Sequence, residues 1–378
     1  MNQTTPGLEQ LIRRAAHDPR VVSLGGGLPA PELFPRREIT AAFHEAMRDP
    51  ACAALQYDWP EGQGRLRSWV AERLSRRGAR ITAEDVVITA GAQQGLALAT
   101  QLLLKAGRIG VEAETYSSAL DLFRRRRAEL VPLDEPADFL YVVDGVSNPR
   151  GQPLDPKLRA QILDSGLPIL ADEAYAELTF GGGLGAPFLA AARERVWHVG
   201  TLSKTLSPGL RVGWLVPPAA LRERIVDLKQ SVDLQTASLG QVIAENFLER
   251  DDFDARLDRA RAFYARRADA LVSALRRRLP AWRFLHPTGG FSVYVETDQP
   301  GDEEAWLRTA LAHGVSFDPG SLFRTDRARE PITMRLCFCT SSPSRLAEGV
   351  LRLAGAWASF LRSPAVEPRA AAAVASAY

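Results

Sequence analysis

Short segments that are apolar almost throughout alternate with amphipathic segments between residues 36 and 216. The apolar segments have the length and β-branched content of strands, and the amphipathic segments repeat with the period of a helix. Strands that are apolar along their whole length and separated by helices are typical of a mainly parallel sheet covered on both faces. The sequence therefore predicts an α/β fold. The expected strands are residues 85–91, 108–112, 139–145, 167–175, 195–203 and 210–216, and the expected helices are 36–49, 61–78, 92–105, 116–126 and 155–164.

The pattern changes after residue 218, where helical periodicity extends through residues 219–279. Phe253, Leu257 and Leu271 are spaced there for one buried helix face. Short strands and a last helix follow, which indicates a smaller α+β domain. The expected strands are 289–296, 314–318 and 332–338, the last helix is 343–362, and a short helix is expected near the N-terminus at 8–17. The expected division is an N-terminal arm over 1–35, a large domain over 36–235, a small C-terminal domain over 236–362 and a mobile tail over 363–378.

The composition is that of an ordinary globular protein, with 46% hydrophobic and 24% charged residues in a chain of 378. A formal net charge of +2 gives no indication of nucleic-acid binding. No apolar run approaches the roughly 18 residues needed to cross a bilayer. The polar N-terminal residues 1–10 also lack the regions of a signal peptide. We therefore expect a cytoplasmic protein with neither nucleic-acid nor membrane partners.

The three cysteines, Cys52, Cys337 and Cys339, are too few for a disulfide framework. Cys337 and Cys339 are two residues apart in a predicted strand, so they share one face. Small core residues are favoured there over a metal-binding pair, and we expect no metal site.

Lysine is rare in this sequence, and one of its four lysines, Lys204, lies directly after a predicted strand in the segment HVGTLSKTLSPGLRVGW. A lysine in a loop is usually a solvated surface charge. Here other polar groups also follow predicted strands, namely Asn148, Asp172 and the turn TAGAQQG at 89–95. Ligands bind beyond the carboxyl ends of the strands in an open parallel sheet. These groups together therefore indicate one binding site.

Several longer motifs occur between residues 20 and 360, in the order and at the spacing of a known family. They are GGLPAPELFP, ALQYDWPEG, TAGAQQGL, SNPRG, ADEAY, SKTLSPGLRVGW and MRL. By these motifs the chain resembles the fold-type-I pyridoxal-phosphate (PLP) enzymes of the class I/II aminotransferase family, and in particular the branch of 2-aminoadipate and kynurenine aminotransferases. The resemblance implies an aspartate aminotransferase-like large domain with a seven-stranded type of sheet, a small C-terminal domain, a PLP cofactor and a homodimer with shared active sites.

The resemblance assigns catalytic roles to Lys204, Asp172 and Tyr175. Lys204 would form a Schiff base with the cofactor aldehyde and then transfer protons, for which an amine is chemically suited. Asp172 would pair with the protonated ring nitrogen, since a buried carboxylate needs a cationic partner; capping of a helix is the alternative. Tyr175 and Asn148 would hydrogen-bond the phenolate oxygen of the cofactor. A core aromatic is the alternative for Tyr175, and a simple turn is the alternative for Asn148.

The resemblance also implies a phosphate site built from backbone N–H groups at a helix start, hydroxyl groups and a guanidinium. Its residues would be Gly91, Ala92, Gln93, Thr201, Ser203 and Arg211. Tyr116 would stack on the pyridine ring, with a core position as the alternative. Tyr57 would reach the phosphate bound by the neighbouring subunit.

Arg335 lies inside an apolar strand, where a buried guanidinium needs an anionic partner. The resemblance implies that this partner is the α-carboxylate of the substrate. A structural salt bridge is the alternative. Gly26, Trp59 and Asn148 are the other expected substrate contacts. Arg150 in SNPRG stands where relatives carry Thr or Ser, and its role stays open.

The expected activity is transfer of the amino group of an L-amino acid to a 2-oxo acid. Elimination, cyclisation, decarboxylation or oxidation of an amino acid would use the same site, so this alternative stays open. Transcriptional regulators of the MocR type carry a similar domain but need a winged-helix domain before it, and only residues 1–20 precede VVSLGGG. The runs LGGGLP and FGGGLG do not lie between a strand and a helix, which argues against a nucleotide-binding dehydrogenase.

Overall fold

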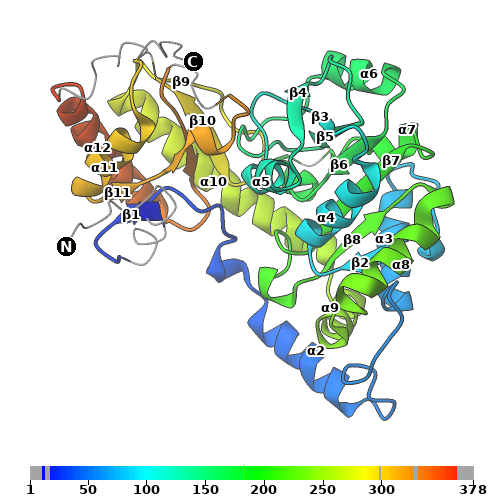
Figure 1. Cartoon of the computed structure of the whole chain (residues 1–378). Helices are drawn as coiled ribbons and strands as arrows, with labels where there is room; N and C mark the ends of the chain where they lie inside the picture. The colour runs from blue at the N-terminus through cyan, green and yellow to red at the C-terminus, as the bar shows by residue number, and fades with distance from the viewer. Residues whose placement is uncertain (1–10, 13–17, 182, 298, 327–330, 364–378) are drawn as a thin grey trace, which may run out of the picture. The chain divides into compact units, whose positions relative to one another are not determined.

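The computed structural model describes residues 11–12, 18–181, 183–297, 299–326 and 331–363 (Figure 1). The chain divides into two compact units. The large unit contains residues 28–265 and 287–291. The small unit contains the described parts of residues 1–27, 266–286 and 292–378.

In the described part of the large unit, seven strands form one sheet in the order β2-β8-β7-β6-β5-β3-β4 (Figure 1). Strand β8 runs antiparallel to both of its neighbours, and the remaining pairs are parallel. The predicted α/β class and the mainly parallel sheet are thereby confirmed. The strands are β2 (Val87–Thr89), β3 (Arg108–Val111), β4 (Glu129–Pro132), β5 (Phe139–Val143), β6 (Ile169–Asp172), β7 (Val196–Thr201) and β8 (Gly213–Val216).

Both faces of this sheet are buried. In β5, Leu140 and Val142 belong to one hydrophobic cluster and Tyr141 and Val143 to another, because successive residues of a strand point to opposite faces. Helices α3 and α9 complete the first cluster, and α4 and α5 complete the second. This two-sided burial explains why the strands are continuous apolar runs in the sequence. The helices are α2 (Arg36–Arg48), α3 (Gly64–Ser75), α4 (Ala92–Leu103), α5 (Ser117–Arg125), α6 (Pro156–Asp164), α7 (Phe188–Ala191), α8 (Arg222–Asp233) and α9 (Ser238–Arg250).

The boundary between the units differs from the expected one at residue 235. Helix α9 belongs to the large unit, where it packs against α2 and α3. Its Gln241 accepts a hydrogen bond from the Gln63 N–H at 2.9 Å, and its Glu245 accepts one from the Leu66 N–H at 2.9 Å. The division falls instead within α10 (Phe253–Arg278), after residue 265. Residues 28–35 of the expected arm also belong to the large unit.

The small unit contains an antiparallel sheet in the order β12-β13-β10-β9 and a parallel pair of β1 with β11. Its core holds Trp282, Trp306 and Trp357, which contact one another edge to face. The expected smaller domain of strands and helices is therefore present. Its elements, besides the end of α10, are β1 (Val22–Ser23), β9 (Arg283–Phe284), β10 (Ser292–Glu296), α11 (Glu303–Ala312), β11 (Val315–Ser316), β12 (Asp318–Pro319), β13 (Thr333–Cys337) and α12 (Pro343–Phe360).

Several elements were not predicted from the sequence pattern, among them the short β1, α7 and β9. Strand β4 is a short edge strand in which only Val131 is buried and which ends at a proline, so it lacks an apolar run. Helix α11 begins after Asp302, whose side chain accepts the N–H groups of Glu304 and Ala305. An aspartate directly before a helix is a start signal that is visible in the sequence.

The cysteines, the two ends of the chain and the question of a membrane-spanning helix were also subjects of expectation. Cys337 and Cys339 are buried, as small core residues would be. Most of the expected helix at 8–17 and of the tail at 363–378 lies outside the described residues. Among the residues that are described, no helix combines the length and the apolar character needed to span a membrane.

Gly213, the first residue of β8, lies against the backbone of the turn that precedes α4. A Cβ atom at this position would come within 2.6 Å of the Gly91 carbonyl carbon and 2.8 Å of the Ala92 nitrogen. We expect Gly213→Ala to lower the free energy of unfolding by about 1–3 kcal/mol, because backbone atoms cannot rotate away as a side chain could. Urea denaturation would measure the change.

Gly64→Ala in the first turn of α3 is the matched control, since nothing lies within 4 Å of the added methyl group. Alanine is also the better helix former, so stability should stay the same or rise by up to about 1 kcal/mol. Equal stability of the two variants would show that the contact at Gly213 does not constrain the fold.

Candidate active site

A cavity of about 150 Å³ lies in the large unit at the carboxyl ends of β5, β6 and β7. This is the edge of a parallel sheet at which ligands bind. The cavity brings together most of the residues that were expected to bind a cofactor. They are Ala92, Gln93, Tyr116, Asn148, Asp172, Tyr175, Thr201, Ser203, Lys204 and Arg211, with Val143, Ala174 and Pro208 completing the wall.

The N-terminus of α4 forms one wall of the cavity. The first N–H groups of a helix have no intrahelical acceptor and lie at the positive end of the helix dipole. Gly91 precedes the helix with φ of +83°, which L-residues rarely adopt. The Gly91 N–H donates to the Thr89 carbonyl at 2.7 Å. This N–H was expected to face a phosphate, but here it is used within the turn. The turn presents instead the residues that follow, Ala92 and Gln93.

Arg211 lies beside the same turn, after the 3₁₀ helix η4 (Pro208–Leu210), in a left-handed backbone conformation. Its Nη2 donates to the Ala90 carbonyl at 2.7 Å. A Cβ atom at Gly91 would lie only 2.5 Å from this Nη2, so glycine makes room for the guanidinium. A planar cation and a helix N-terminus thus share one wall, a combination suited to a phosphate group.

Thr201 and Ser203 end β7 and lead to Lys204. The Thr201 hydroxyl donates to the Val212 carbonyl at 2.8 Å and accepts the Ser203 N–H at 3.1 Å. The two hydroxyl oxygens are 2.9 Å apart. These contacts hold the turn that carries Lys204 while both hydroxyl residues line the cavity.

Asp172 is the last residue of β6 and is only 3% exposed. Its Oδ2 accepts a hydrogen bond from the Tyr141 hydroxyl at 3.0 Å, and its Oδ1 accepts one from the Ala174 N–H at 3.0 Å. Burial raises the pKa of Asp172, while these two donors and the nearby charge of Lys204 act in the opposite direction. The Ala174 contact closes a turn rather than capping a helix, and Asp172 also lines the cavity.

Tyr141 was not among the predicted site residues. It is fully buried in β5, and burial together with the Asp172 charge raises its pKa. Its hydroxyl therefore stays protonated and donates a hydrogen bond to Asp172. A hydroxyl inside the apolar run FLYVV was a signal, because a buried tyrosine usually needs a hydrogen-bond partner. The sequence alone could not identify that partner, which comes from the neighbouring strand.

Lys204 and the remaining predicted residues lie on other walls of the cavity. The Lys204 Nζ is 5.3 Å from the centroid of the Tyr175 ring. Tyr175 packs edge to face against Phe291, so it is both a core aromatic and a cavity residue. Asn148 is buried in the loop after β5, and Tyr116 is half-buried just before α5.

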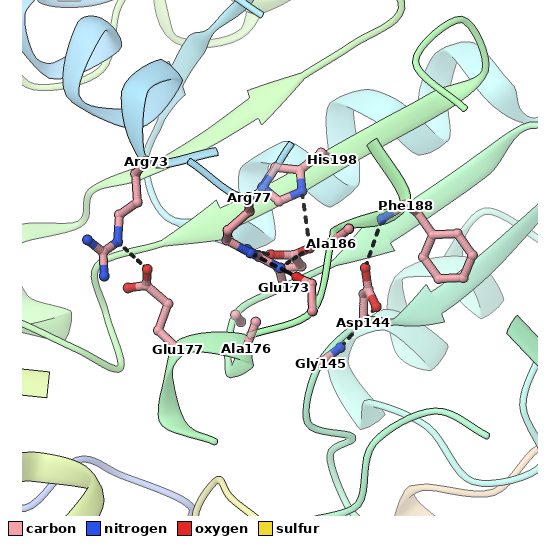
Figure 2. Close-up of polar contacts among 12 residues, drawn as sticks. Arg73, Arg77, Asp144, Gly145, Glu173, Ala176, Glu177, Ala186, Phe188 and His198 are labelled. Carbon is pink, nitrogen blue, oxygen red and sulfur yellow. Dashed lines mark hydrogen bonds and ion pairs between the residues drawn. The ribbon is translucent and has the colours of Figure 1, made fainter. Parts of the chain in front are cut away.

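A second layer of polar and charged residues, which do not line this cavity, follows the same strands (Figure 2). Glu173 accepts hydrogen bonds from Arg77 at 2.5 and 3.2 Å, and His198 Nδ1 lies 3.8 Å from its Oε1. Burial and then the Arg77 charge lower the pKa of His198 to about 3, so its ring is neutral. Because His198 Nε2 accepts the Trp214 N–H at 3.3 Å, we assign the ring proton to Nδ1, which faces Glu173.

Asp144, directly after β5, extends this layer (Figure 2). It accepts hydrogen bonds from Arg159 at 2.6 Å and from the Phe188 N–H at 3.1 Å. Burial and the Glu173 charge raise the pKa of Asp144 to about 6, and Arg159 opposes that rise. The layer therefore holds the acids that follow β5 and β6 in ion pairs with Arg159 and Arg77, and the neutral ring of His198 in β7 lies beside Glu173.

Several predicted residues do not line this cavity. Tyr57 and Trp59, in the loop between α2 and α3, are 76% and 78% exposed. Gly26 and Arg335 belong to the small unit. Arg150 Nη1 lies 4.0 Å from Glu114 and its side chain is about half-exposed, which favours a peripheral ion pair for this residue.

Arg335 is buried in β13 and does have an anionic partner. Its Nε and Nη2 donate to Asp318 Oδ2 at 3.1 and 2.7 Å. The structural salt bridge that was the alternative for Arg335 is therefore present. A role in binding the substrate carboxylate stays a prediction.

The donors and acceptors of the cavity fit PLP group by group. The start of α4, Ser203 and Arg211 suit the phosphate, and the buried carboxylate of Asp172 suits a protonated ring nitrogen. Lys204 supplies an amine for the aldehyde.

Comparison with known proteins leads to the same cofactor. The profile of the family described as Aminotransferase class I and II matches residues 37–353. The chain is 35% identical to the 2-aminoadipate transaminase of Thermus thermophilus over 89% of each protein. It is 33% identical to aromatic-amino-acid aminotransferase 1 of Thermococcus litoralis, over 88% of this chain and 87% of that one. The kynurenine aminotransferase of Pyrococcus horikoshii, solved in complex with PMP, superimposes with a TM-score of 0.87 at 28% identity over 96% of both chains.

These similarities extend over nearly the whole chain, and they include a solved structure that holds a form of the cofactor. The chain has the fold of these enzymes and, in one cavity, the groups that PLP requires. The chain therefore belongs to the class I and II aminotransferase family, and it is a PLP-dependent aminotransferase.

Proposed function

We propose that this aminotransferase moves the amino group of an L-amino acid to a 2-oxo acid, with Lys204 as the residue that bonds to the cofactor. The observation that supports the proposal is the meeting of Lys204, Asp172 and Arg211 in one cavity at the ends of the parallel strands. When bound, PLP supplies an aldehyde that accepts the amino group and a ring that withdraws electrons from the substrate α-carbon. The expected cytoplasmic location stays a prediction.

We assign phosphate binding to the first turn of α4, Ser203 and Arg211. Arg211 donates to a neutral carbonyl, that of Ala90, so its positive charge is available for an anion. The helix dipole adds a favourable interaction with negative charge at the same wall. Ala92 and Gln93 carry the N–H groups that we assign to the phosphate.

Asp172 holds a proton at the ring nitrogen by pairing with it. A buried carboxylate is costly without a cation, and this cost favours the protonated form of its partner. Tyr141 and Ala174 each hydrogen-bond one of the two carboxylate oxygens and so orient the group. Tyr141 is thus a positioning residue that acts through Asp172.

Lys204 Nζ can bond to the aldehyde and, when released, can accept and return a proton. The turn that carries it is held by Thr201 and Ser203. Tyr175 and Asn148, which line the same cavity, are assigned to the phenolate oxygen of the cofactor, and Tyr116 is assigned to the face of the ring.

Arg335 is assigned to the α-carboxylate of the substrate, together with Asn148 and the Gly26 backbone. A planar guanidinium can hold a carboxylate by two parallel hydrogen bonds, which supports this assignment. The side chain of the substrate is not identified, because the relatives named above act on aminoadipate, aromatic amino acids and kynurenine.

A homodimer is supported by an exposed apolar surface near Tyr57. Leu55, Tyr57 and Trp59 are exposed on one loop. Leu239 at the start of α9 is also partly exposed, and the loop is joined to that region by a hydrogen bond from Ser238 to the Gln56 carbonyl. Clustered exposed apolar residues mark interaction surfaces. We assign Tyr57 and Trp59 to the active site of the neighbouring subunit.

Turnover should require both an amino-acid donor and a 2-oxo acid, and it should require Lys204. A panel of L-amino acids, each with and without 2-oxoglutarate or pyruvate, would be followed by chromatography of both products. We expect Lys204→Ala to reduce the rate at least a hundredfold, because no other amine lines the cavity in the described part of the chain. Release of ammonia, carbon dioxide or peroxide without an oxo acid would instead support the alternative PLP chemistry.

The control for this experiment is Lys157→Ala, which removes an exposed lysine of α6 and should retain full activity. Borohydride reduction of the yellow holoenzyme should attach a phosphopyridoxyl group to the peptide that contains Lys204, in the wild type and in Lys157→Ala. Attachment to a different lysine would overturn the assignment.

Tyr141→Phe tests the positioning of Asp172. It removes the hydrogen bond but keeps the ring that packs against Phe123. The pKa of Asp172 rises further without this donor, so its hold on the ring-nitrogen proton weakens. We expect kcat/KM to fall about tenfold, since a hydrogen bond to a charged group contributes roughly 1.5–3 kcal/mol.

Asp172→Asn removes the charge itself and should lower kcat/KM by at least about a hundredfold at saturating PLP. Steady-state kinetics of the two variants would show the order of the effects. Wild-type kinetics for Tyr141→Phe, or a loss as large as that of Asp172→Asn, would disprove the positioning role.

Mixing two inactive variants tests whether Tyr57 serves the neighbouring subunit. In a heterodimer of Lys204→Ala with Tyr57→Ala, one of the two sites would receive both native residues. Unfolding and refolding the variants together should then restore about one quarter of the wild-type activity. No recovery, with dimers present by sedimentation, would mean that Tyr57 acts within its own subunit, and full activity of Tyr57→Ala alone would mean that it has no role at either site.

A further inference from the structure

The small unit supplies its own carboxylate to Arg335. Asp318 in β12 lies directly opposite Arg335 in β13 in the antiparallel register. Its Oδ2 accepts hydrogen bonds from Arg335 Nη2 at 2.7 Å and from Nε at 3.1 Å. The guanidinium also stacks over the Phe323 ring at 4.5 Å.

The glycine run after β1 closes over this ion pair. The Gly26 N–H donates to the same Asp318 Oδ2 at 2.9 Å. A Cβ atom at Gly25 would lie 2.9 Å from Asp318 Oδ1, and one at Gly27 would lie 3.5 Å from Arg335 Nη1. The close approach to Asp318 requires glycine at position 25, whereas a Cβ atom at position 27 would make an ordinary contact with Arg335.

The pair is buried and electrically neutral. Asp318 is 4% exposed and Arg335 is 9% exposed. Two other arginines of the small unit are buried: Arg324 is paired with Glu303 at 3.1 Å, and Arg267 donates to the Cys339 carbonyl. A second carboxylate brought to Arg335 would thus place two anions on one guanidinium in a region of low dielectric constant, where like charges repel strongly.

We propose that Asp318 is a specificity-determining residue that weakens the affinity of Arg335 for a free α-carboxylate. As a result, the enzyme discriminates little between an α-amino acid and its uncharged α-carboxamide, and donors with an uncharged carboxyl derivative are accepted. This inference rests on the proposed function, in which Arg335 receives the carboxyl end of the substrate. Asp318 differs in this respect from a residue that merely orients Arg335, because an orienting residue would raise carboxylate affinity.

Asp318→Asn tests the proposal, since it removes the negative charge and keeps the size and an oxygen acceptor for Gly26. We expect KM for L-amino acids and for 2-oxo acids to fall tenfold or more, with little change for L-amino-acid amides. The ratio of kcat/KM for acid over amide should rise accordingly. Asp302→Asn, which alters an exposed helix cap in the same unit, is the matched control and should leave that ratio unchanged.

Binding without turnover provides a second measurement. The dissociation constants of propionate, hexanoate and 3-phenylpropionate, and of their primary amides, would be compared by calorimetry on the holoenzyme. In Asp318→Asn the acids should bind at least tenfold tighter and the amides unchanged. If this variant is unstable, the acids should raise its Tm more than that of the wild type, because they replace the lost partner of Arg335.

Unchanged or weaker acid binding in Asp318→Asn would overturn the inference and leave Asp318 as a structural partner. Arg335→Gln separates this failure from failure of the proposed function. If Arg335→Gln raises KM for acids while Asp318→Asn has no effect, only the inference on Asp318 is wrong. If Arg335→Gln leaves KM for acids unchanged, the assignment of Arg335 to the substrate is wrong as well.

Discussion

The site in the large unit depends on keeping the buried carboxylate of Asp172 ionisable at the edge of the sheet. Burial raises the pKa of Asp172, and three groups oppose that rise: the Tyr141 hydroxyl in β5 and the Ala174 N–H by hydrogen bonds, and Lys204 after β7 by its charge. Two of these groups belong to strands on either side of β6. The register of three parallel strands therefore decides whether the acid can serve a cationic ligand.

Glu173, the residue after Asp172, is also a buried carboxylate that needs partners. Asp172 and Glu173 are consecutive, so their side chains point in opposite directions. Asp172 lines the cavity, while Glu173 meets Arg77 and His198 in the second layer (Figure 2). Arg77 and Arg159 thereby neutralise the acids that follow β6 and β5, and loss of either arginine would leave a buried charge without its partner.

Arg211 and Arg335, the two arginines assigned to anions, differ in whether their hydrogen-bond partner is neutral or negatively charged. Arg211 donates to a neutral carbonyl, and Gly91 makes room for its guanidinium. Arg335 differs, because its partner is the carboxylate of Asp318, against which Gly25 packs. A phosphate carrying more than one negative charge thus meets an uncompensated cation, whereas a group reaching Arg335 meets a neutral pair. The physical difference is one acidic side chain in β12.

The sequence by itself determined the fold class and most of the cavity. Two-sided burial leaves continuous apolar runs, and the polar residues that end them, such as Asp172 and Lys204, must converge at one edge of a parallel sheet. Tertiary structure alone decided the partners: Tyr141 for Asp172, Asp318 for Arg335, and the assignment of α9 to the large unit. The periodicity of the sequence indicates which face of an element is buried. It does not indicate which residue of another strand lies opposite, because that depends on register and packing between distant segments.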